Sequence, residues 1–203
     1  MADIRSVNYE QIPGKANEIQ GQGRQLNSEL SNAWNSVNDL RSTWHGKRYN
    51  TLISYFNNIT DEVNSMLKLV ICEIPEALGT VAKNYAMADG GSVAAVGAGT
   101  VNAISTMGDS DTTTMAYNSS NASDVQSSVS TNFSTAESLM NDIESTFASI
   151  DWESEAKNAF QQRISSLKGQ ITEALENIRT QFTTLMQESQ SDIEGAESAN
   201  TVQ

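Results

Sequence analysis

The stretch STWHGKRY, from Ser42 to Tyr49, lies between two long amphipathic segments and decides the fold. Before it, apolar or small residues recur in alternating steps of four and three positions, at Ile12, Ala16, Ile19, Gly23, Leu26, Leu30, Ala33, Val37, Leu40 and Trp44. After it, the same alternation continues at Leu52, Phe56, Ile59, Val63, Met66 and Val70. Such a repeat places each set on one side of an α-helix. Gly46 interrupts both patterns and accepts the backbone angles of a tight turn, so the stretch predicts a helical hairpin with Trp44 at its tip.

The second half of the chain repeats this organisation. One set of apolar residues recurs at Val125, Val129, Phe133, Ala136, Met140, Ile143, Phe147 and Ile150, and Ser123 is a suitable N-cap for its helix. A break with Trp152 follows, and then a set at Ala156, Phe160, Ile164, Leu167, Ile171, Ala174, Ile178, Phe182 and Leu185. Each hairpin leaves one apolar stripe on each helix to be buried. The sequence therefore predicts an all-α protein of two long hairpins packed as an elongated four-helix bundle.

Three segments follow from these patterns. The first hairpin covers residues 1–90, with helices expected from Pro13 to Ser42 and from Lys47 to Asp89, the second kinked at Pro75. Residues 91–121 are rich in Gly, Ala, Ser and Thr and predict a flexible linker. Residues 122–203 form the second hairpin, and its acidic tail is expected to be disordered from about residue 191.

The charge of the chain restricts its partners. It carries 12 Lys and Arg against 25 Asp and Glu, a formal net charge of −13. Residues 1–91 contribute −2 and residues 92–203 contribute −11. An acidic surface argues against nucleic acid and anionic membranes as partners. No apolar run is long enough for a membrane span, and the amino-terminal residues lack the apolar core of a signal peptide. If the protein leaves the cytoplasm, we expect a route that reads a folded or carboxyl-terminal signal.

No set of residues points to chemistry. His45 is the only histidine and Cys72 the only cysteine, so neither an intrachain disulfide nor a histidine-rich metal site is expected. Cys72 lies too far along the predicted helix to act with His45 at the turn. No glycine-rich phosphate loop follows a strand. We therefore expect no enzyme, no cofactor and no metal, and a function that rests on protein–protein interaction.

Two motifs in the first hairpin carry a family resemblance. Trp44-His45-Gly46 lies at the turn between two heptad helices, and Tyr85-Ala86-Met87-Ala88-Asp89 lies at the end of the second. Over about residues 5–90 the chain resembles the WXG100 (ESAT-6-like) family, the helical-hairpin substrates of type VII (ESX) secretion systems. The resemblance implies that Trp44 and Gly46 form the turn and that Tyr85 and Asp89 form a Tyr-x-x-x-Asp/Glu export motif. It also implies secretion without a signal peptide.

The second hairpin has a similar shape, so the chain looks like a tandem fusion of two family hairpins. Its turn reads Trp152-Glu153-Ser154, with Ser in place of Gly, and no export motif follows it. Hairpins of the family pair antiparallel, which implies that Trp152 lies near Tyr85 and Asp89. The family analogy also implies that the secretion ATPase reads this composite end. A parallel arrangement would strain the linker less, and linker length does not decide between the two.

Several alternatives stay open at this point. Trp44 and Trp152 fill a hairpin tip if buried and serve recognition if they keep an exposed edge. Tyr85 is either part of the export motif or simply the last apolar residue of its helix. The chain is a secreted substrate, a targeting chaperone for a larger helical toxin, or a structural cell-surface or filament protein. Pairing within the chain, as a homodimer or with a helical sister protein would all satisfy the apolar stripes.

Overall fold

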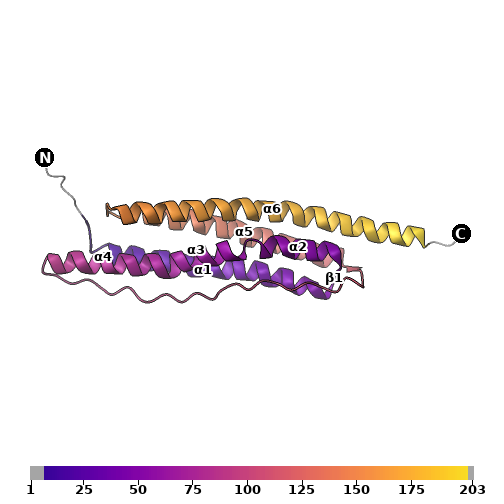
Figure 1. Cartoon of the computed structure of the whole chain (residues 1–203), viewed down its shortest axis with the longest axis horizontal. Coiled ribbons are helices and arrows are strands. Elements are labelled where there is room, and N and C mark those ends of the chain that lie inside the picture. The colour runs from indigo at the N-terminus through magenta and orange to yellow at the C-terminus, as the bar shows by residue number, and fades with distance from the viewer. Residues whose placement is uncertain (1–6, 201–203) are drawn as a thin grey trace.

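The computed structural model describes residues 7–200 and shows a rod of long helices (Figure 1). The elements of its first half are α1 (Ile12–Asp39), the 3-10 turn η1 (Leu40–Ser42), β1 (Trp44–His45), α2 (Lys47–Asn57), α3 (Thr60–Lys68), the π-helical segment η2 (Leu69–Glu73) and α4 (Ile74–Ala88). Together they form hairpin 1, in which α1 runs to the tip at β1 and α2 through α4 return. The predicted hairpin about Ser42 to Tyr49 is confirmed.

The returning arm of hairpin 1 is less regular than predicted. It breaks after Asn57, and it widens to a π-helical turn at η2, directly before Pro75 at the start of α4. The π-helical turn and Pro75 together mark the place where the sequence predicted a kink. The break at Asn57 was not predicted, because the apolar steps continue through it without a gap.

Hairpin 2 consists of α5 (Ser119–Ala148) and α6 (Glu155–Ala199). The helix α5 begins earlier than expected, because Asn118 and not Ser123 is its N-cap and accepts a hydrogen bond from the Asn121 amide at 3.0 Å. The tail expected to be disordered is helical over residues 191–199, and residues 201–203 lie outside the described part of the chain. Arg48 on α2 anchors this end of α6 through ion pairs with Glu188 at 2.6 Å and Asp192 at 3.2 Å.

The two hairpins pack antiparallel as a four-helix bundle. The tip of hairpin 1 lies beside the far end of α6, where Trp44 meets Ser189. At the other end, Arg163 near the start of α6 forms a 2.7 Å ion pair with Glu73 of η2. The all-α fold and the elongated bundle are thus confirmed, with the second hairpin reversed relative to the first.

The predicted apolar stripes meet in one continuous core. Every member of both stripes of hairpin 1 is buried, from Ile12 to Trp44 and from Leu52 to Val70. At mid-length Trp34 of α1 packs edge-on against Phe56, 4.9 Å between ring centroids, and Phe133 of α5 lies 6.3 Å from the same tryptophan. The tryptophan at position 34 lies outside the predicted stripe but at the centre of the core. No helix within residues 7–200 has the length and apolar character that crossing a bilayer requires.

The segment between the hairpins differs from the expected flexible linker. Residues 91–115, which we call the strap, contain no helix and run the length of hairpin 1 in an extended path (Figure 1). The strap ends at β2 (Ala116–Tyr117), which pairs antiparallel with β1 through Trp44 opposite Tyr117 and His45 opposite Ala116. Side chains of hairpin 1 hydrogen-bond to the strap backbone along much of this path. These bonds fix the position of the strap on hairpin 1, which its composition does not reveal.

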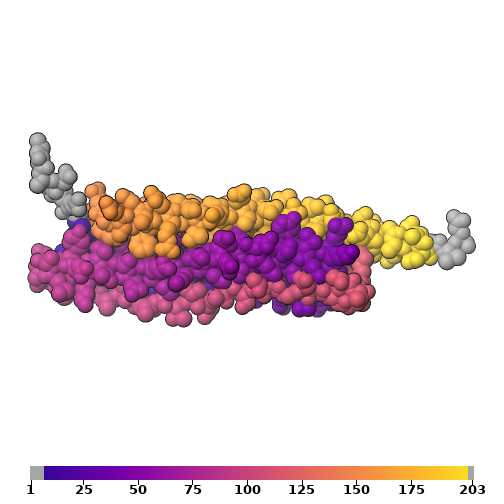
Figure 2. Space-filling model, in the orientation of Figure 1, coloured from indigo at the N-terminus to yellow at the C-terminus, as the bar shows by residue number. Residues whose placement is uncertain are grey.

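The hairpins are staggered along the rod. In Figures 1 and 2 the end of α4 extends beyond the α5–α6 turn on one side, and α6 extends beyond the tip of hairpin 1 on the other. Each end of the molecule therefore exposes the end of one hairpin that the other does not cover.

Candidate functional site: the two ends of the bundle

Trp44 at the tip of hairpin 1 is buried and not exposed for recognition. Its side chain is 1% exposed. Its ring lies 5.2 Å from Tyr117 and 6.0 Å from Phe182 between centroids, and its indole N–H donates to the Ser189 hydroxyl at 3.1 Å. The aromatic contacts supply apolar packing and the hydroxyl satisfies the only polar atom of the ring. These contacts favour the interpretation of Trp44 as a plug that ties the tip to the end of α6.

Gly46 has a backbone conformation that explains its presence next to this plug. Its φ is +109° and its ψ is −170°, a region that is open almost only to glycine. Its amide donates to the hydroxyl of Ser110 on the strap at 3.1 Å. The glycine thus lets the chain turn from β1 into α2 while its N–H remains hydrogen-bonded.

The α5–α6 turn also reverses the chain between two helices, but it contains no glycine. Trp152 is 5% exposed, so it also fills a hairpin tip. Ser154 has extended backbone angles and acts as the N-cap of α6, its hydroxyl accepting from the Lys157 amide at 3.0 Å. A helix N-cap favours Ser, and no positive φ is needed there. The replacement of Gly by Ser in the second turn therefore has a local structural reason.

The Tyr85–Asp89 segment lies at the exposed end of α4. Tyr85 is 40% exposed and Met87 is 64% exposed, two of the three large apolar side chains that are exposed within the described residues. Asp89 caps α4, with its amide bonded to the Tyr85 carbonyl at 3.1 Å. The ring of Tyr85 is therefore accessible at this end of the bundle.

Tyr9 is a partner of Asp89 that the sequence did not reveal. Its hydroxyl donates to the Asp89 carboxylate at 2.6 Å. This hydrogen bond to Asp89 is the main cause that raises the pKa of Tyr9 above its ordinary value. The contact joins residues 80 positions apart, and no local pattern in the amino-terminal residues points to it. The bond holds the carboxylate of Asp89 in one place at the open end of hairpin 1.

Trp152 and the Tyr85–Asp89 segment lie toward the same end of the rod. The antiparallel pairing brings the α5–α6 turn to this end, although the stagger leaves the end of α4 beyond it (Figure 1). No hydrogen bond or ring contact joins Trp152 to Tyr85 among residues 7–200. The two motifs therefore share one end of the bundle, as expected, but no such bond or ring contact joins them within the described residues.

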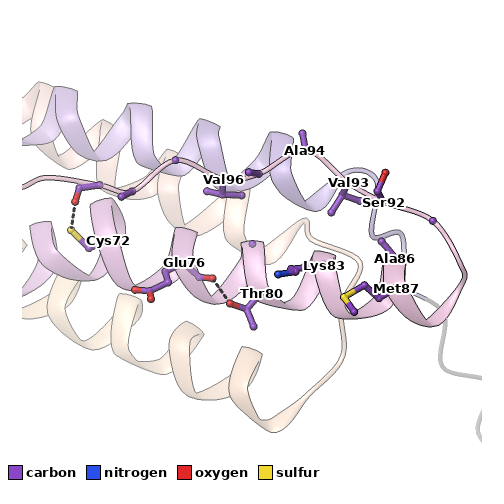
Figure 3. A pocket seen from close by; sticks show the side chains of 16 residues that line it. Cys72, Glu76, Thr80, Lys83, Ala86, Met87, Ser92, Val93, Ala94 and Val96 are labelled. Atoms are coloured by element: carbon purple, nitrogen blue, oxygen red, sulfur yellow. Dashed lines mark hydrogen bonds between the residues drawn. The ribbon is translucent and has the colours of Figure 1, made fainter.

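A shallow groove of about 650 Å³ runs from this end between α4 and the start of the strap. Figure 3 shows Val96 directed towards α4 and Ala94 directed away from it, while Cys72 reaches the strap. The polar groups of the lining, among them Glu76, Thr80 and Lys83, do not form a metal site. No group of three or more His, Cys, Asp or Glu side chains within the described residues is placed to hold a metal ion.

Comparison with known proteins decides the identity of the first hairpin. The model of the WXG100 family, proteins of 100 residues with WXG, matches residues 5–90. Residues 5–90 belong to the WXG100 family. Neither the curated proteins nor the solved structures gave a match to the chain.

The WXG100 unit coincides with hairpin 1 as the structure shows it. Its Trp-x-Gly tripeptide is the turn at Trp44 and Gly46, and the match ends directly after Asp89. WXG100 proteins are associated with type VII secretion as substrates. Hairpin 2 lies outside the matched residues, and its likeness to the WXG100 unit is one of shape.

Proposed function

We propose that this chain is a type VII secretion substrate that acts by protein–protein interaction and not as an enzyme. It would be secreted without a signal peptide as a self-paired bundle. In this proposal the export machinery, and its secretion ATPase in particular, recognises the open end of hairpin 1 through Tyr85 and Asp89. The observation that carries the proposal is the exposure of Tyr85 close to the end of α4, the end of the helix that extends past hairpin 2.

The arrangement supports distinct roles for the motif residues. Tyr85 offers an aromatic face to a partner, and Asp89 offers a carboxylate that Tyr9 already orients. Both tryptophans are buried, so Trp44 and Trp152 would act by shaping the bundle ends and not by touching the machinery. An oriented carboxylate beside an exposed aromatic ring is a compact recognition element, since little side-chain entropy is lost when it binds.

An export assay in a bacterium with an active type VII system tests this proposal. Tyr85→Ala and Asp89→Ala should abolish export while leaving the far-ultraviolet circular dichroism and the melting temperature of the purified protein nearly unchanged. Met87→Ala is the matched control, because Met87 is more exposed than Tyr85 on the same turn. Normal export of the Tyr85→Ala variant would refute the motif assignment. Export that persists in a strain without the secretion ATPase would refute the pathway.

The alternative role, a targeting chaperone for a larger helical toxin, makes a different demand on the structure. A client helix needs an unpaired apolar stripe. Both stripes of hairpin 1 are buried within the chain. Among the described helices, α6 has the most half-buried apolar residues, at Phe160, Leu167, Ala174 and Met186. If a client were bound, it would lie along α6, and it would co-purify with the wild-type chain in a fixed ratio.

A further inference from the structure

The strap lies between two rows of polar side chains that project from hairpin 1 at seven-residue spacing. One row, on α2 and α3, consists of Asn50, Asn57 and Asn64. The other consists of Gln20 and Asn27 on α1 and Arg41 on η1. A spacing of seven residues, or a multiple of it, brings side chains to the same face of a helix. The two rows therefore form the two walls of a groove along hairpin 1.

Each asparagine of the first row binds one strap residue through both groups of its amide. Asn64 donates to the Ile104 carbonyl at 2.9 Å and accepts from the Ile104 amide at 2.9 Å. Asn57 makes the same pair of bonds with Met107, both 2.8 Å. Asn50 does so with Ser110, at 3.2 and 2.8 Å. A side-chain amide thus replaces the neighbouring strand that would otherwise satisfy this backbone.

The distance between successive asparagines on the helix matches the distance between the strap residues that they bind. Seven helical residues advance about 10.5 Å, and three residues of an extended chain advance about 9 to 10 Å. The asparagines step by seven, from position 50 to 64, while the strap steps by three, from position 110 to 104. The strap therefore stays in register with α2 and α3 over all three pairs.

The opposite wall binds other carbonyl groups of the strap. Gln20 donates to the Gly97 carbonyl at 3.1 Å and Asn27 donates to the Asn102 carbonyl at 2.8 Å. Arg41 donates to the carbonyl of Asp109. Gln20 is 4% exposed and Asn27 is 9% exposed, so water could not easily replace the strap as their partner.

Strap side chains enter the groove at every third position. Ile104, Met107 and Ser110 are buried, whereas the two residues between each pair are exposed. Gly99 makes the closest approach: a Cβ atom there would lie 1.9 Å from the carbonyl oxygen of Ile71. A Cβ on Gly97, two residues earlier, would meet nothing within 4 Å.

We propose that this groove is a binding site for an extended polypeptide and that the strap is its ligand within the chain. Asn50, Asn57 and Asn64 recognise the backbone. The Gly99 position admits only a residue without a side chain, and the positions of Ile104 and Met107 take aliphatic side chains. On this proposal the strap is held by binding and not merely by its covalent ends. The inference does not depend on the export proposal, because it rests on contacts along hairpin 1 and not on Tyr85 or Asp89.

Cutting the full chain on both sides of the strap tests the proposal directly. Protease sites inserted after Gly90 and after Thr114 fall at exposed positions outside the asparagine pairs. After cleavage, the strap fragment should co-elute with both hairpins in size-exclusion chromatography, as identified by mass spectrometry. A labelled peptide of residues 91–114 should exchange into the complex, and a scrambled peptide should not. A strap that separates from the cleaved wild-type protein would overturn the proposal.

Paired variants separate specific binding from loose adhesion. Gly99→Ala should release the cleaved strap, whereas Gly97→Ala should retain it. Asn57→Ala removes two hydrogen bonds and should speed release about tenfold or more. Asn58→Ala is its control, because Asn58 is exposed and makes no side-chain hydrogen bond within the described residues. Circular dichroism of the uncut variants checks that the bundle is intact. Equal retention in the Gly99→Ala and Gly97→Ala variants would overturn the assigned geometry.

Discussion

The indole N–H of Trp44 donates to the hydroxyl of Ser189 at 3.1 Å, across 145 positions of sequence. The bond joins the tip of hairpin 1 to the end of hairpin 2, and both partners are buried. Trp44→Ala should lower the free energy of unfolding by about 3 to 5 kcal/mol, because it leaves a large cavity. Ser189→Ala should cost about 1 kcal/mol, since it leaves the indole N–H unpaired. Urea titrations measure both values, and an unchanged midpoint for Trp44→Ala would refute its role as a plug.

The two Trp-containing turns should lose different amounts of stability when Gly and Ser are exchanged between them. Gly46→Ser forces a side chain onto a φ of +109° and should cost about 1 to 3 kcal/mol. Ser154→Gly introduces a residue that helix N-caps tolerate, and it should cost only a few tenths of a kcal/mol. Ser154→Ala is the control for the cap and should cost about 1 kcal/mol. Thermal melts of the three variants rank these costs, and similar losses for Gly46→Ser and Ser154→Gly would contradict the distinction.

Tyr49 makes the stability of the bundle sensitive to alkaline pH. Burial raises the pKa of Tyr49 to about 12, and its hydroxyl donates to the Val37 carbonyl at 3.1 Å. A folded-state pKa above the unfolded value of about 10 means that the neutral phenol stabilises the fold below pH 10. This stability is lost as the pH rises from about 10 towards 12.

The comparison with Tyr49→Phe isolates this effect. Near pH 8 the wild type should be more stable than the variant, because it keeps the buried hydrogen bond. Between pH 10 and 12 the difference in melting temperature between the two proteins should shrink, since only the wild type loses the Tyr49 contribution. Parallel melting curves at all pH values would contradict the assignment.

The burial of the apolar stripes within one chain predicts a monomer. The hairpins satisfy each other, so light scattering should give a mass near 22.0 kDa over a wide concentration range. A dimer would mean that hairpins pair between chains. Growth to large species with concentration would favour the filament interpretation.

The helices and the bundle were predictable because one apolar repeat governs each of them. Trp34 lies outside these repeats, at seven-residue spacing from Asn27 and Arg41. This second row on α1 and η1 is mostly polar because the strap backbone is its partner, and apolar periodicity does not reveal such a row. The asparagine row on α2 and α3 likewise has no apolar period, because its partner is the strap backbone.

The strap shows the limit of reading a segment by composition. Its Gly, Ala, Ser and Thr content predicted mobility, and its seat depends on partners that lie 40 to 77 positions away in the sequence. The signal was a period of three in the buried residues Ile104, Met107 and Ser110. That period matches neither an α-helix nor a β-strand, so it predicts neither element. The contact of Tyr9 with Asp89 is likewise long-range, and residue type alone did not indicate it.

The pairing of seven helical residues with three strap residues has a consequence for how such a chain can change over time. Each step of three residues along the strap must match a step of seven residues along α2 and α3 for the amide pairs to form. Losing one residue between Ile104 and Ser110 would misalign every amide pair beyond the deletion, whereas losing three would move the strap by one whole step. Insertions and deletions in this segment should therefore be tolerated in threes, matched by heptads in the helix, and the length of a sequence that looks featureless is under tight geometric control.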